Sequence, residues 1–65
     1  MTYALSDPTY GYRLYRGPLF CKLECGLYAE WVARDAIREA FQSGWYDRAE
    51  VTRDGVVIDN LENEK

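Results

Sequence analysis

The chain has no histidine, only two cysteines, and no run of the roughly 18 apolar residues that a membrane-spanning helix needs. The absence of histidine removes the commonest general base, and two cysteines supply half of a tetrahedral metal site. The sequence has no glycine-rich phosphate loop or catalytic signature, and its N-terminus lacks the basic and apolar segments of a secretion signal. We therefore expect a cytoplasmic protein that is not an enzyme and uses neither cofactor nor metal.

The two cysteines, Cys21 and Cys25, are close in sequence but badly placed for a disulfide. On one extended strand their Cα atoms would lie about 13 Å apart, which is beyond disulfide reach. We expect two free thiols that are buried or half-buried.

With 65 residues, the chain is long enough for one domain with one small core. Hydrophobic residues make up 48% of it and aromatic residues 15%, so aromatic side chains must supply much of the buried area. We expect a single domain, 1–65, with frayed ends at 1–8 and 60–65.

The net charge of −3 arises from the C-terminal third, where residues 47–65 hold six acids and three bases. Proteins whose main partner is nucleic acid usually show the opposite bias, because phosphate neutralisation dominates their affinity. The charge distribution therefore argues against direct nucleic-acid binding.

Two alternating runs near the N-terminus predict a hairpin. In 10–16 the alternation places Tyr10, Tyr12 and Leu14 on one face, which we assign to the core. A second alternating run, 19–24, follows a Gly-Pro turn. The two runs together form the first half of the predicted sheet.

Residues 27–43 predict an amphipathic helix, since their apolar residues gather on one face at 100° per residue. Gly44 predicts a left-handed end to this helix. Residues 46–59 predict a second hairpin around Asp54-Gly55, the preferred dipeptide for a type I′ turn. The expected fold class is α+β, an antiparallel sheet of two hairpins with one helix packed on a face, in the order ββαββ.

The register of the second hairpin predicts an acidic surface. A two-residue loop places Val51 opposite Ile58 on the core face and Glu50 opposite Asp59 on the outer face. Facing carboxylates repel by about a few tenths of a kcal/mol at an exposed site, so stability alone would rarely favour the pair. We expect an acidic rim that docks on a basic protein surface, formed by Asp47, Glu50, Asp54 and Asp59. The alternative is that these are solvated charges that serve solubility.

Trp31 lies nearly opposite the apolar face of the predicted helix, beside Asp35. An exposed tryptophan among charges is typical of a protein-binding hot spot, so Trp31 and Asp35 are candidate contacts for a partner. The alternative is that Trp31 folds over the end of the first hairpin near Gly26 or against Tyr3.

The first strand allows a different function. Aromatic residues interleaved with arginines can stack bases and hold phosphates. A nucleic-acid-binding regulator would use Tyr10, Tyr12, Arg13, Tyr15 and Arg16. A third alternative is an accessory module that packs on a larger protein through exposed aromatics.

The acidic segment GWYDRAEVTRDGVVIDNLENEK, together with the small size and the two-hairpin pattern, resembles the phage-encoded anti-CRISPR proteins. The resemblance covers the whole chain and is strongest to inhibitors of type I surveillance complexes. These inhibitors share no motif, so the resemblance assigns no residue by position. It implies a stoichiometric inhibitor that occupies a basic, nucleic-acid-binding groove of a Cas subunit, in part by imitating the charge of DNA.

Overall fold

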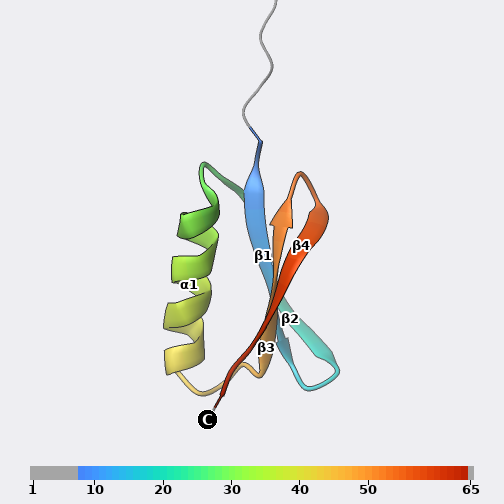
Figure 1. Cartoon of the computed structure of the whole chain (residues 1–65). Coiled ribbons are helices and arrows are strands. Elements are labelled where there is room, and N and C mark those ends of the chain that lie inside the picture. The colour runs from blue at the N-terminus through green and yellow to red at the C-terminus, as the bar shows by residue number, and fades with distance from the viewer. Residues whose placement is uncertain (1–7, 65) are drawn as a thin grey trace, which may run out of the picture.

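In the computed structural model, which describes residues 8–64, four antiparallel strands form one sheet and one helix lies on a single face of it (Figure 1). The elements in chain order are β1 (Tyr10–Arg16), β2 (Leu19–Leu27), α1 (Glu30–Gln42), β3 (Arg48–Arg53) and β4 (Val56–Glu62). The sheet order β2-β1-β3-β4 joins the two hairpins through their inner strands. The predicted α+β fold of order ββαββ is confirmed.

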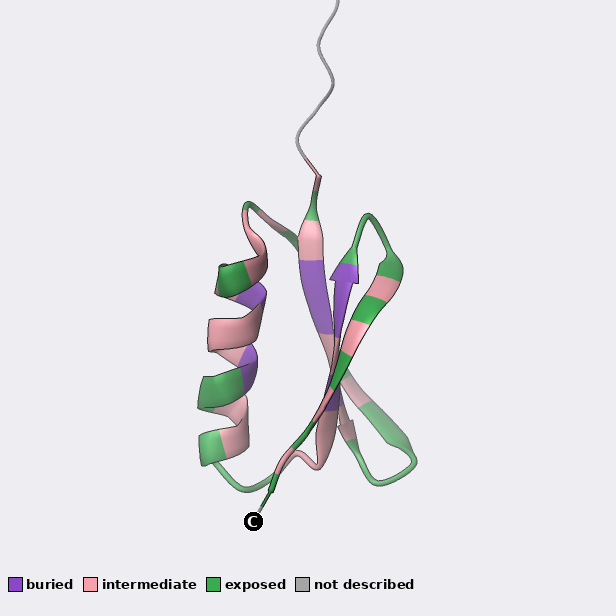
Figure 2. Cartoon of the chain, viewed as in Figure 1, coloured by how far each residue is buried: buried purple, intermediate pink, exposed green. Residues whose placement is uncertain are grey.

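The core lies between α1 and the two central strands (Figure 2). β1 contributes Tyr12 and Leu14, as predicted, and β3 contributes Ala49 and Val51. The third residue assigned to the core, Tyr10, is only half-buried and lies outside the core cluster, at the start of β1 beside Arg53. Small residues allow the helix to approach the sheet closely, which leaves the larger side chains to fill the remaining space. The fully enclosed helix residues are Ala33 and Ile37.

The sheet face opposite α1, here called the open face, is not covered by any helix or strand within residues 8–64. The register places Arg13 beside both Leu23 and Glu50, and Tyr15 beside Phe20, on this face. Phe20 and Leu23 on the outer strand are 51% and 55% exposed, respectively. A sheet with one covered and one solvated face is the usual antiparallel solution.

The first helical residue is Glu30, so the predicted start at residue 27 was wrong. A bulge shifts the β1–β2 register between Tyr10 and Tyr12, and Gly26 there adopts a φ of 83°. This conformation lets β2 continue to Leu27, whose side chain still packs against the core. Leu27 therefore contributes to the core, but it does so from the end of a strand and not from the helix.

The second hairpin has the predicted turn but a different register beyond it. Asp54 and Gly55 have φ angles of 52° and 85°, as a type I′ turn requires, and Thr52 pairs with Val57 as expected. A bulge then shifts the register between Val51 and Thr52. Consequently Val51 lies opposite Asp59 and Glu50 lies opposite Asn60, and the predicted pairs Val51–Ile58 and Glu50–Asp59 were wrong.

The C-terminal residues are more ordered than the sequence suggested. β4 runs to Glu62, and the Asn63 side chain donates hydrogen bonds to the backbone oxygens of Phe41 and Tyr46 at 3.1 and 3.0 Å. The predicted fraying therefore does not apply to residues 60–63, because residues 60–62 pair with β3 and Asn63 is hydrogen-bonded to Phe41 and Tyr46. Residues 1–7 and 65 lie outside the described part of the chain.

Both cysteines are free thiols, as expected. Cys21 is half-buried, whereas Cys25 is exposed, so the predicted burial was wrong for Cys25. Both residues lie on β2, an outer strand of the sheet, where solvent reaches one side of the backbone.

Gly11 is required by the close approach of β2. A Cβ built at Gly11 would collide with the Glu24 carbonyl oxygen and lie 2.9 Å from the Cys25 Cα. We expect Gly11→Ala to lower the free energy of unfolding by about 1–3 kcal/mol, because backbone atoms must move. Gly26→Ala is the control, since its Cβ would meet nothing within 4 Å and would cost only backbone strain. Urea unfolding of both variants tests this, and a Gly11→Ala variant as stable as the original chain would contradict it.

Candidate functional site

Glu50 is the centre of a polar cluster on the open face. Its carboxylate accepts a hydrogen bond from the Tyr15 hydroxyl at 2.9 Å and lies 3.4 Å from Arg13 and 3.6 Å from Arg48. The Arg48 guanidinium also stacks on the Tyr15 ring, 4.0 Å from its centre. With its side chain only 17% exposed, Glu50 is a structural acceptor whose charge is largely neutralised.

Asp59 lies on the other face of the sheet, beside the helix. Its carboxylate accepts a hydrogen bond from Arg34 at 2.9 Å, and Arg34 also pairs with Glu30 at 2.6 Å. The hydrogen bond from Arg34 holds the pKa of Asp59 below its ordinary value, with help from the Asn60 backbone N–H. The facing carboxylates expected from the sequence thus do not exist, because the bulge moves Asp59 to the helix side.

The two remaining acids of the predicted rim lie at opposite ends of β1. Asp47 accepts a hydrogen bond from the Gly17 backbone N–H at 2.7 Å, just after β1. Asp54 accepts one from the Thr9 backbone N–H at 2.9 Å, just before β1. These carboxylates connect the two hairpins, so the four predicted rim residues occupy different parts of the fold.

Trp31 and Tyr28 form an exposed aromatic pair at the start of α1. Their ring centres are 5.9 Å apart and their planes meet at 87°, an edge-to-face contact. Trp31 is 62% exposed and Tyr28 is 73% exposed, which confirms the exposure expected from the helical position of Trp31. The alternative contact with Tyr3 concerns a residue outside the described part of the chain.

Asp35 lies one helical turn after Trp31 and pairs with Arg38 at 3.0 Å. The structure therefore brings two predicted contacts, Trp31 and Asp35, to the same side of α1. The sequence reasoning missed Tyr28, although its spacing of three residues before Trp31 was a usable signal.

The tyrosines and arginines of β1 are engaged with other parts of the protein. Tyr12 is 4% exposed, and its hydroxyl donates to Glu24 at 2.6 Å. Burial, followed by the hydrogen bond to the Glu24 carboxylate, raises the pKa of Tyr12 to about 12. Arg16 stacks on Trp45, with its guanidinium 3.8 Å from the ring centre.

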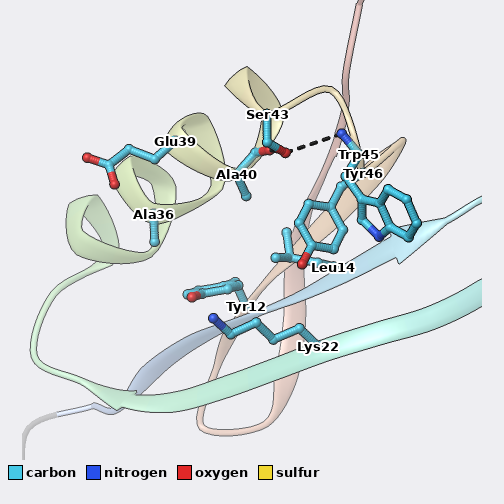
Figure 3. Close-up of a pocket in the computed structure, with 9 residues that line it drawn as sticks. All are labelled: Tyr12, Leu14, Lys22, Ala36, Glu39, Ala40, Ser43, Trp45 and Tyr46. Atoms are coloured by element: carbon cyan, nitrogen blue, oxygen red, sulfur yellow. Dashed lines mark hydrogen bonds between the residues drawn. The ribbon is translucent and has the colours of Figure 1, made fainter.

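A pocket of about 480 Å³ opens between β1, β2 and the C-terminal half of α1 (Figure 3). Figure 3 shows the Lys22 side chain running alongside Tyr12, with Ala36 and Ala40 on the helix above them. Trp45 and Tyr46 close one end, where the Trp45 backbone N–H donates to the Ser43 hydroxyl at 3.2 Å. The lining combines apolar side chains with one cation, Lys22, and one anion, Glu39, so it offers a partner apolar contact and groups of either charge.

Comparison of the chain with models of protein families, with curated protein sequences and with solved structures finds no match.

In the part of the chain that the structure describes, no helix has the length and apolar character needed to cross a membrane.

Removing the Glu50 carboxylate should destabilise the protein, whereas removing one member of a repelling pair would stabilise it. We expect Glu50→Ala to lower the free energy of unfolding by about 1–3 kcal/mol, because it leaves the Tyr15 hydroxyl and two arginines without their acceptor. Glu39→Ala, which removes an exposed helical carboxylate, should change stability by less than about 0.5 kcal/mol. Chemical denaturation measures both, and a Glu50→Ala variant as stable as the original chain would remove the structural role.

The raised pKa of Tyr12 predicts a loss of stability in alkali. An unfolded tyrosine loses its proton near pH 10, whereas Tyr12 in the fold keeps it up to about 12. The contribution of the Tyr12 hydroxyl to the free energy of unfolding is therefore fully present below pH 10 and is lost as the pH rises towards 12. We expect Tyr12→Phe to lose less stability than the original chain over this window. Chemical denaturation at several pH values in this window measures the difference, and a Tyr12→Phe variant with the same slope of unfolding free energy against pH as the original chain would contradict the prediction.

Proposed function

We propose that this protein is a non-enzymatic inhibitor that binds another protein through the Tyr28–Trp31 aromatic pair and thereby blocks a basic, nucleic-acid-binding surface. The observation that carries the proposal is the simultaneous exposure of these two adjacent rings, 73% and 62%. Tryptophan and tyrosine are enriched among the residues that dominate binding energy at protein interfaces. A small chain gains stability by burying such rings, so leaving both exposed favours a binding role.

The edge-to-face contact prepares the pair for binding. Each ring restricts the other in the free protein, so less side-chain entropy is lost when a partner covers them. Aromatic side chains also have few rotatable bonds for their area. The pair can therefore act as an anchor without a preformed deep pocket.

The charges around the pair favour a basic partner. Glu30, Asp35 and Asp59 lie on the helix side of the sheet, and the whole chain carries −3. The arginines that pair with these acids reduce the local field, so charge contributes to steering and the rings contribute the affinity. Direct recognition by aromatics thus has more support than imitation of a DNA strand, since the four rim acids are dispersed over the fold.

The resemblance to anti-CRISPR proteins supplies the class of partner, a Cas subunit of a type I surveillance complex. Blocking its nucleic-acid groove requires only stable occupancy, which fits a chain without histidine. The nucleic-acid regulator has less support, because Tyr12 is buried and Arg13 and Tyr15 are bound to Glu50.

The test measures target-DNA binding by a purified type I surveillance complex in a gel-shift titration with this protein. We expect inhibition by the original chain. The double substitution Tyr28→Ala and Trp31→Ala should raise the half-inhibitory concentration by about tenfold or more. Val56→Ala is the control, because Val56 is 64% exposed at the start of β4 and belongs neither to the aromatic pair nor to the pocket.

Three results would contradict the proposal in different ways. If the original chain inhibits no type I complex, the partner class is wrong. If the double variant inhibits as well as the original chain, the aromatic pair is not the contact surface. If the protein alone shifts the labelled duplex at low salt, it acts as a nucleic-acid binder.

A further inference from the structure

The outer edge of β2 is a free strand edge with an unusual sequence. β2 is the terminal strand of the sheet, and its nine residues read LFCKLECGL. An edge strand presents backbone N–H and C=O groups that can pair with another chain, and natural proteins usually protect such edges with charge, proline or a covering element. Figure 2 shows much of β2 as exposed. The sequence of β2 therefore indicates which strand this free edge can pair with.

The sequence of β2 is complementary to itself in antiparallel orientation. When the strand is rotated about Leu23, Lys22 of one copy lies opposite Glu24 of the other, and the same pair recurs by symmetry. Cys21 lies opposite Cys25, and Leu19 lies opposite Leu27. Phe20 lies opposite Gly26, and the one charged pair, which occurs twice, is of opposite sign.

The side chains of Lys22 and Glu24 point to the same side of the sheet, as this register requires. Lys22 and Glu24 pair with Leu14 and Tyr12 of β1, so both point to the helix side. Leu23 pairs with Arg13, so it points to the open face and meets its own copy at the centre. Because the pairings of residues 22–24 with β1 are regular, the two oppositely charged side chains would lie on one face, at cross-strand distance.

We propose that β2 pairs antiparallel with β2 of a second copy of this chain, centred on Leu23, and that the protein is a twofold-symmetric dimer with one continuous sheet. Main-chain hydrogen bonds between the two edges provide affinity, and the Lys22–Glu24 pairs set the register. On the open face the exposed Leu23 of each copy meets the Leu23 of the other. This proposal goes beyond the proposed function and does not depend on it.

Lys22 is available for this pairing. Its ammonium takes part in none of the ion pairs among residues 8–64, whereas four arginines there do. Glu24 receives one hydrogen bond, from the Tyr12 hydroxyl, and a carboxylate can accept several. The dimer gives the lysine a partner and uses the remaining capacity of the carboxylate.

The opposite edge, β4, does not offer an equivalent surface. Rotating Val56–Glu62 about its central residue places Asp59 opposite its own copy, which is repulsive. Both edge strands carry bulges, two on β2 and one on β4, so this feature does not distinguish them. The choice of β2 over β4 therefore follows from charge complementarity.

The first experiment measures mass in solution by sedimentation velocity under reducing conditions. We expect the original chain to form a dimer. Lys22→Glu and Glu24→Lys should each weaken it by at least about tenfold in dissociation constant, because each change creates two like-charged pairs. An equimolar mixture of the two variants should restore the dimer, since both mixed pairs are then of opposite charge. Circular dichroism of each variant checks that it is folded.

The second experiment tests the register through the thiols and does not depend on the charge variants. Diamide oxidises facing thiols to a disulfide and takes up the two protons and two electrons. The register predicts that Cys21→Ser and Cys25→Ser do not cross-link alone, because each remaining thiol faces a serine. Mixed together, they should give a covalent dimer, since Cys25 of one chain then faces Cys21 of the other.

The outcomes decide the proposal. A monomer at concentrations up to about millimolar, where even weak specific association is detected, would overturn it. So would a dimer that Lys22→Glu leaves unchanged, or a single-cysteine variant that cross-links with itself as readily as the mixture. A dimer dissociated by each charge variant and restored by mixing them, with cross-linking only in the cysteine mixture, would establish the β2 interface.

Discussion

The rest of the structure depends on the pairing of β1 with β3. This contact joins the two hairpins into one sheet, and it places the buried residues of both strands beneath a single helix. One 13-residue helix can cover little more than two strands, so the outer strands and the open face remain in water. The need for a core in a short chain thus determines where the binding surfaces are. Large apolar side chains that the core cannot accommodate are exposed on β2, on β4 and at both ends of α1.

Local patterns were sufficient to predict the fold. Alternation in β1, the helical spacing of apolar residues and the Asp54-Gly55 turn each act over a few residues, and all three agree with the structure. The register beyond Thr52 could not be predicted in this way. A single extra residue at Ile58 has no strong local signal, yet it moves Asp59 to the other face. The bulge creates stabilising contacts between residues far apart in sequence, because the shift brings Asp59 to Arg34 and lets Leu61 pack against the core.

The candidate site was harder to predict for the same reason. Trp31 was found because helical geometry fixes the direction of a side chain from spacing alone. The facing pair of Glu50 and Asp59 was wrong because the register depends on a bulge. The positions of Asp47 and Asp54 depend on long-range contacts with Gly17 and Thr9, which no local pattern indicates. Charge counted along the sequence therefore overstated the charge available to a partner. What remains free is a pair of rings whose exposure does not depend on the register of any strand.

Trp31 lies away from the β2 edge, although Tyr28 directly follows the last residue of β2, and this arrangement has a consequence for binding. Trp31 lies one turn before Arg34, and Arg34 is bound to Asp59 on β4, whereas β2 forms the other edge of the sheet. Pairing through β2 would therefore leave the Trp31 ring of each copy of a dimer accessible. Two such anchors on one rigid body would act together on a partner that repeats its binding surface, because the second contact forms at high effective concentration. Subunits repeated along a nucleic-acid-binding filament are a partner of this kind, and a small chain with a modest contact area per copy could then bind tightly without any additional interface.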